Sequence, residues 1–151
     1  MNEQSISNRT MPPCTVIPVL VYPNVDEAIP WLINAFGFKL RWRMGSHRTQ
    51  LAYNDGCVVV TDGFANEPDV TGNEPNARTH SVMMRIVDID DHFANAVKHG
   101  AIVLHEPRDF FYGERQYSVK DIGGHVWTFS QSFKDVSPEE FGAVTGEGTQ
   151  V

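Results

Sequence analysis

The chain has few cysteines, no long apolar run and no leader-like start, and each shortage excludes a class of protein. Its two cysteines, Cys14 and Cys57, have neither the spacing of a metal-binding motif nor the number that a disulfide framework needs, so we expect a reduced, cytoplasmic protein. No apolar run approaches the roughly 18 residues that a membrane-spanning helix requires. The N-terminus also lacks the charged-then-apolar order of a signal peptide.

Basic residues are also scarce. Lys and Arg number 12 against 19 Asp and Glu, which gives a formal net charge of −7 over 151 residues. A protein that binds nucleic acid phosphates usually presents a basic face, so we expect no nucleic-acid partner and no membrane partner. The sequence contains no Gly-rich phosphate loop, no Ser-His-Asp arrangement and no activated-cysteine pattern.

The chain does contain the same order of elements twice. A strand, a helix and three more strands are predicted first in residues 14–63 and again in residues 79–132. The first helix carries Ile29, Leu32 and Phe36 on one face, with Asp26 as the predicted N-cap and Gly37 as the stop. The second helix is capped by Asp88 and stopped by Gly100. The two hairpins repeat about 65 residues apart, which indicates two similar βαβββ modules.

A unit of about 50 residues seldom folds alone, because one face of its sheet stays uncovered. We therefore predict an α+β fold in which the two modules build a curved eight-stranded mixed sheet, with the helices on its outer face and a trough inside. Residues 1–13 are predicted to be a disordered arm, residues 64–78 a linker, residues 107–112 an aromatic loop, and residues 133–151 a tail with a helix start at Ser137.

Three stretches, residues 26–38, 86–101 and 121–127, resemble the vicinal oxygen chelate superfamily. This superfamily includes glyoxalase I, extradiol dioxygenases, and the fosfomycin- and bleomycin-resistance proteins. The combination of Tyr112-Gly113-Glu114-Arg115 with Gly124-His125-Val126-Trp127 looks most like its glyoxalase/bleomycin-resistance branch. The resemblance implies paired βαβββ modules, a ligand trough and a homodimer.

The resemblance also implies a divalent metal, held by His or Glu side chains from the first and last strands of each module. The matching positions here are apolar or hydroxyl-bearing: Ile17, Val60 (or Thr61), Val82 and Thr128. His80, two residues before Val82, is the only candidate ligand. Because a stable zinc or iron site needs three or four ligands, we expect no cofactor, and a divalent metal is the less supported alternative.

Alternation along the last strand places Thr128 toward the trough and Trp127 with Phe129 toward the helices. Thr128 is one candidate ligand-binding residue. On the preceding strand, Arg115 could hold an anionic or carbonyl-bearing ligand, and Tyr117 shares its parity; Tyr112 and Phe110 could form an aromatic lip and Trp42 a wall of the trough. Structural roles are the alternatives for three of these features. Arg115 could be a solvated arginine on an edge strand, and Trp42 an ordinary core residue. The loop with Tyr112 and Phe110 could pack on the end of the sheet or form a dimer contact.

Three functions fit these residues. The preferred one is a protein that binds a small organic molecule in an aromatic-lined trough without turning it over. The second is an enzyme: a metal-dependent lyase or dioxygenase built around His80, or a metal-free isomerase with Glu114 or Glu106 as base. The third is a structural or partner-binding unit. The sequence does not decide whether the chain is an enzyme, and it favours a binding protein over an enzyme.

Overall fold

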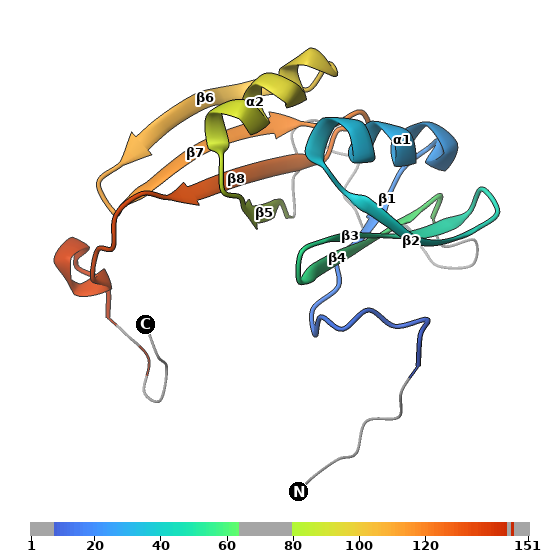
Figure 1. The fold of residues 1–151 in the computed structure, drawn as a ribbon, viewed down its shortest axis with the longest axis horizontal. Helices are drawn as coiled ribbons and strands as arrows, with labels where there is room; N and C mark the ends of the chain where they lie inside the picture. The colour runs from blue at the N-terminus through green and yellow to red at the C-terminus, as the bar shows by residue number, and fades with distance from the viewer. Residues whose placement is uncertain (1–7, 64–79, 145, 147–151) are drawn as a thin grey trace, which may run out of the picture. The chain divides into compact units, whose positions relative to one another are not determined.

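A computed structural model describes residues 8–63, 80–144 and 146 (Figure 1). These residues fall into two compact units. The first comprises the residues up to Ile33 together with Gly37–Gly63, and the second comprises Asn34–Phe36 together with the residues that follow Gly63. The predicted linker at residues 64–78 lies outside the described residues. The α+β class and the two βαβββ modules are confirmed, with four strands in each of two mixed sheets.

The first unit contains one helix, except for the last three residues of that helix, and a four-stranded sheet in the order β1-β4-β3-β2. β1 runs parallel to β4, and the other neighbours are antiparallel. The bounds are β1 Val19–Val21, α1 Val25–Phe36, β2 Lys39–Met44, β3 Arg48–Tyr53 and β4 Gly56–Thr61. Leu20, Leu51 and Val60 are buried, which makes β1, β3 and β4 the centre of this unit's core.

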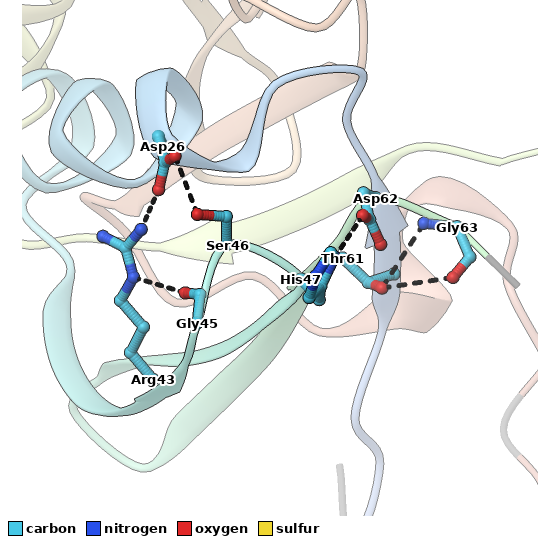
Figure 2. A network of polar contacts seen from close by, with 8 residues as sticks. All are labelled: Asp26, Arg43, Gly45, Ser46, His47, Thr61, Asp62 and Gly63. Carbon is cyan, nitrogen blue, oxygen red and sulfur yellow. Dashed lines mark hydrogen bonds and ion pairs between the residues drawn. The ribbon is translucent and has the colours of Figure 1, made fainter. Parts of the chain in front are cut away.

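Helix α1 begins two residues earlier than we predicted. Asn24 is the N-cap, and its side chain accepts the Glu27 N–H at 3.1 Å. Asp26, the predicted cap, instead binds Arg43 and accepts the Ser46 hydroxyl at 2.9 Å (Figure 2). The carboxylate of Asp26 therefore ties the first turn of α1 to the turn between β2 and β3. Gly37 ends the helix as predicted, with a φ of +88°.

The second unit repeats the arrangement with the order β5-β8-β7-β6, again with one parallel pair, β5 and β8. Its bounds are β5 Val82–Arg85, α2 Ile89–Lys98, β6 Ile102–Phe110, β7 Glu114–Lys120 and β8 Val126–Ser132, followed by the 3-10 turn η1 Pro138–Phe141. Asp88 caps α2 as predicted, accepting the Asp91 N–H at 3.3 Å.

The predicted aromatic loop at residues 107–112 is wrong for residues 107–110, because β6 continues to Phe110. The pairing of β6 with β7 shifts register between His105 and Arg108. Pro107 lies within this irregular stretch, where a residue without an N–H removes no regular ladder bond. We expected the strand to end before Pro107, but β6 continues through this residue.

The two faces of the second sheet differ in polarity, and the predicted alternation of β8 is confirmed. Trp127 and Phe129 are fully buried, and the Phe129 ring lies 4.4 Å from that of His92 in α2. Thr128 lies on the opposite face, where its Oγ1 is 2.7 Å from the Ser118 hydroxyl. The α2 side is thus the apolar core, and the other side carries hydroxyl and carboxyl groups.

His92 is a half-buried histidine with fixed partners on both ring nitrogens. Nε2 lies 3.0 Å from the Phe36 carbonyl, which can only accept, so Nε2 carries the proton and Nδ1 accepts from the Tyr117 hydroxyl at 2.5 Å. Burial lowers the pKa of His92 below its ordinary value, and the bond to the Phe36 carbonyl opposes this only in part. The folded state therefore favours neutral His92.

This lowered pKa predicts a pH-dependent stability. Between the folded pKa and the unfolded value of about 6.5 the unfolded chain binds more protons. The His92 contribution is therefore fully present above about pH 6.5 and is lost as the pH falls below it. Urea unfolding measured from pH 7.5 to 5 should show falling stability, with a smaller slope in His92→Gln and the full slope in His105→Gln. An equal slope in all three proteins would contradict this assignment.

None of the helices in the described residues is both long and apolar enough to cross a membrane.

Candidate functional site

A hollow of about 490 Å³ lies on the polar side of the second sheet. β5, β7 and β8 form its floor, and the chain that follows β8 forms a wall. The residues that line it are Met83, Met84, Arg85, Tyr112, Gly113, Glu114, Ser130, Ser132, Lys134, Asp135 and Val136. All of them belong to the second unit.

Gly113 brings the wall of the hollow against the sheet. Its carbonyl accepts the Phe133 N–H at 2.9 Å and the Lys134 N–H at 3.4 Å. A Cβ atom at Gly113 would lie 2.1 Å from the Lys134 carbonyl oxygen, and the φ of +87° is one that side-chain-bearing residues rarely adopt. A glycine is therefore needed at residue 113 for the segment that begins at Phe133 to pack against its backbone.

The predicted aromatic lip is a cluster that includes the C-terminal turn. The Tyr112 ring stacks on Phe110 at 5.2 Å and lies 5.4 Å from Phe111. Phe141, from η1, lies 6.0 Å from Tyr112 and 6.1 Å from Phe111. Of these four rings, Tyr112 lines the hollow. Burial raises the pKa of Tyr112, and the charge of Glu114 adds to the effect, so its hydroxyl stays protonated and able to donate.

The floor of the hollow holds a half-buried carboxylate. Glu114 Oε1 accepts the Ser130 hydroxyl at 2.5 Å and the Gln116 amide at 3.1 Å. Among the described residues, the second oxygen of Glu114 makes no hydrogen bond. Glu114 is thus fixed in position by two donors and keeps one oxygen for a further partner.

Two cations line the same hollow. Arg85 pairs in register with Ser130 across the β5–β8 ladder, and Lys134 comes from the wall. Neither forms an ion pair with another described residue, whereas Arg43 and Arg115 both do. Arg85 and Lys134 can therefore take an anionic partner without first losing another.

The structure places Arg115 and Tyr117 on the α2 side, not on the trough side that we expected. Arg115 Nη1 lies 3.0 Å from Asp109, Arg115 Nε lies 3.1 Å from Asp90 in α2, and the hydrogen bonds to these two carboxylates raise the pKa of Arg115. Tyr117 is fully buried beside Phe129, its partner across the ladder. Neither residue lines the hollow, and a ligand-binding role for them stays a prediction.

The other candidate residues lie apart from the hollow. Glu106 is exposed on β6, and Trp42 lies in the first unit, where its indole N–H donates to the Thr10 carbonyl at 3.3 Å. His80 is exposed with its ring 6.3 Å from that of His125. Within the described ranges, no three His, Cys, Asp or Glu side chains come close enough to share a metal ion.

Sequence reasoning missed Arg85, Ser130 and the wall at residues 134–136. Strand alternation from Thr128 was enough to place Ser130 on the same face. Arg85 follows only from the parallel register of β5 with β8. No sequence signal marked Lys134, which lies in an irregular segment.

Comparison with known families gives a match over most of the chain. The model of the glyoxalase/bleomycin resistance protein/dioxygenase superfamily matches residues 13–129. An uncharacterized protein of Mycobacterium bovis is 28% identical over 90 residues, which are 60% of this chain and 57% of that protein. The chain thus spans little more than half the length of this relative.

Solved structures share the fold. TioX from Micromonospora sp. ML1 is 29% identical with a TM-score of 0.65, over 79% of this chain and 98% of that one. The genomically encoded fosfomycin resistance protein FosX from Listeria monocytogenes is 12% identical with a TM-score of 0.62, over 81% of this chain and 95% of that one. At 12% identity, the second likeness shows the fold alone.

Proposed function

Because the chain belongs to the glyoxalase/bleomycin resistance protein/dioxygenase superfamily, we propose that it binds a small organic molecule in the hollow of the second unit. One observation carries the proposal: Arg85, Lys134 and the half-buried Glu114 line the same hollow. Neither Arg85 nor Lys134 forms an ion pair among the described residues. Its volume of about 490 Å³ is within the range of small-molecule sites.

The lining defines the chemistry of the ligand. Arg85 and Lys134, with the hydroxyl of Ser132, suit a carboxylate, phosphate or phosphonate, whereas the Ser130 hydroxyl already donates to Glu114. Met83, Tyr112 and Val136 offer apolar surface for the body of the molecule. Glu114 accepts a hydrogen bond from a hydroxyl or amine. The ligand is therefore an organic anion with a hydrogen-bond donor at some distance from its anionic group.

The residues at the family's metal positions do not fit a metal. Ile17, Val60 and Val82 have no side-chain lone pair, and the Thr128 hydroxyl bonds to Ser118. We propose that the hollow binds its ligand without a metal. Binding without metal chemistry is the function that this chain's own residues support best.

One observation favours a second candidate, a metal-free isomerase. Glu114 lines the hollow, one of its oxygens is held by Ser130 and Gln116, and its other oxygen has no described partner. A carboxylate fixed in this way can remove a proton from a bound substrate and return it to another atom. Turnover of a bound organic acid that is lost in Glu114→Gln, with binding retained, would favour this candidate over simple binding.

Isothermal titration against a panel of organic acids and their neutral amide analogues tests the proposal. We expect acids to bind and amides to bind at least tenfold more weakly, because a charge-assisted bond contributes about 1.5–3 kcal/mol. Arg85→Gln should weaken binding of the best acid by at least tenfold. Lys98→Gln, which removes one positive charge from α2 outside the hollow, is the matched control and should change Kd by less than twofold. Equal losses in both variants, or equal binding of acids and amides, would contradict the proposal.

We also propose that the chain acts in the cytoplasm and that it forms a homodimer. The small number of cysteines supports the cytoplasmic location, and the family resemblance supports the homodimer. Burial and the neighbouring Cys14 raise the pKa of the Cys57 thiol, which keeps it protonated and unreactive. Light scattering coupled to gel filtration measures the mass directly against the 16.9 kDa of one chain.

A further inference from the structure

The first unit holds a segment of its own N-terminal arm by backbone carbonyls. The Gln50 amide donates to the Thr10 carbonyl at 2.9 Å, and the Trp42 indole donates to the same oxygen at 3.3 Å. Arg41 reaches the carbonyls of Arg9 and Met11 at 3.4 and 3.5 Å. Three neighbouring side chains of β2 and β3 thus contact three consecutive carbonyls of the arm.

Gln50 is fixed so that its N–H groups face the arm. Arg41 donates to Gln50 Oε1, and a guanidinium has no acceptor, so the amide oxygen must point toward Arg41 and the nitrogen toward Thr10. Gln50 is only 4% exposed. A buried amide N–H without an acceptor costs about 1–3 kcal/mol. With the arm in place, the Thr10 carbonyl is the acceptor that satisfies this amide.

The arm is shaped to present those carbonyls. Asn8 Oδ1 accepts the Thr10 N–H at 3.1 Å and the Thr10 hydroxyl at 2.9 Å, while the Asn8 carbonyl accepts the Met11 N–H at 3.1 Å. This local turn uses the donors of the arm and leaves its carbonyls at residues 9–11 for the sheet. The side chains of Arg9, Thr10 and Met11 stay exposed, so these three residues are held through their carbonyls, whereas the next residue of the arm, Pro12, is buried.

We propose that Arg41, Trp42 and Gln50 form a second binding site, for a peptide-like ligand that offers consecutive amide carbonyls. The arm is the occupant of this site within the chain, and such a ligand displaces it. The site belongs to the first unit and shares no residue with the hollow of the second. It stands whether or not the hollow binds an organic anion.

Attachment through a short segment gives the arm an effective concentration in the millimolar range. A ligand in solution must compete with it, so the intact chain binds the ligand weakly. Removal of the arm should raise the affinity at least tenfold. The probe is a fluorescent synthetic peptide of residues 1–13, added to a chain that lacks residues 1–11 and to the full chain, with anisotropy as the readout.

Two variants of the shortened chain identify the site. Gln50→Leu removes the buried amide and should reduce peptide binding at least tenfold. Thr49→Val is the matched control: this neighbour in β3 is also buried, and its hydroxyl has no hydrogen-bond partner among the described residues. It should leave binding unchanged. A peptide with Ala at residues 9–11 should bind within threefold of the original, because its carbonyls are retained.

Absence of binding to the folded shortened chain, or equal binding by its Gln50→Leu variant, would overturn the proposal. If the shortened chain does not fold, the same peptide titration is done on the full chain that carries Asn8→Gly. This substitution removes the acceptor that orders the arm, and it should raise peptide affinity above that of the unaltered chain. No rise in affinity would overturn the proposal equally.

Discussion

Replacing Asp121 by Ala should lower the free energy of unfolding by about 3–5 kcal/mol, because its carboxylate satisfies three buried or part-buried donors. Oδ1 accepts the Gly123 and His125 N–H groups, each at 2.9 Å, and Oδ2 accepts the Trp127 indole N–H at 2.8 Å. Asp121 is 3% exposed and Trp127 is fully buried. Urea unfolding of the two proteins measures the difference.

The first hairpin supplies the control for this variant. Asp55, in the corresponding turn between β3 and β4, is exposed, and Asp55→Ala should change stability by no more than about 0.5 kcal/mol. Asp121→Asn should fall between the two, since it keeps an acceptor for the backbone and loses the one for Trp127. Similar effects of Asp121→Ala and Asp55→Ala would show that the carboxylate does not hold this hairpin together.

Gly113→Ala should detach the wall of the hollow and abolish binding of the organic acid. Two effects act against an added methyl group: the φ of +87°, and a Lys134 carbonyl oxygen 2.1 Å from the Cβ position. The two nearest atoms belong to the Lys134 backbone, so the clash is not with the end of a flexible side chain that could move aside. We expect a loss of at least about 3 kcal/mol in stability, or release of the tail with a folded sheet. Urea unfolding and calorimetry with the acid distinguish these outcomes.

Gly124 isolates the steric part of that effect. Its φ of +85° is nearly the same, but a Cβ there would meet no atom within 4 Å. Gly124→Ala should therefore cost only the backbone strain, about 1–2 kcal/mol, and should leave acid binding intact. If Gly113→Ala and Gly124→Ala have equal effects, the close packing of the tail on Gly113 is not a requirement for the hollow.

The repeated βαβββ order and the faces of β8 were predictable from the sequence, because they depend on short-range periodicity. Alternation alone placed Thr128 opposite Trp127 and Phe129. The helix stop at Gly37 and the cap at Asp88 were local signals as well. Asp26 misled the prediction of α1 because its side chain has a distant partner, Arg43, that no local rule indicates (Figure 2).

The candidate site was less predictable, since it depends on register and on an irregular segment. Arg115 and Tyr117 lie on the α2 side, where we did not expect them, because the ladder pairs Tyr117 with Phe129. The spacing within one strand cannot show this pairing. Lys134 reaches the hollow only because the tail packs on Gly113, and a glycine in a sequence does not reveal which backbone will approach it.

The most direct test of the central claim is an NMR titration of the isotope-labelled full chain with the best-binding organic acid. Ligand binding in the hollow predicts the largest amide shifts at residues 83–85, 113–114, 130–132 and 134–136, and their loss in Arg85→Gln. Largest shifts in the first unit, or saturable binding that leaves these four segments unchanged, would contradict a ligand site in this hollow.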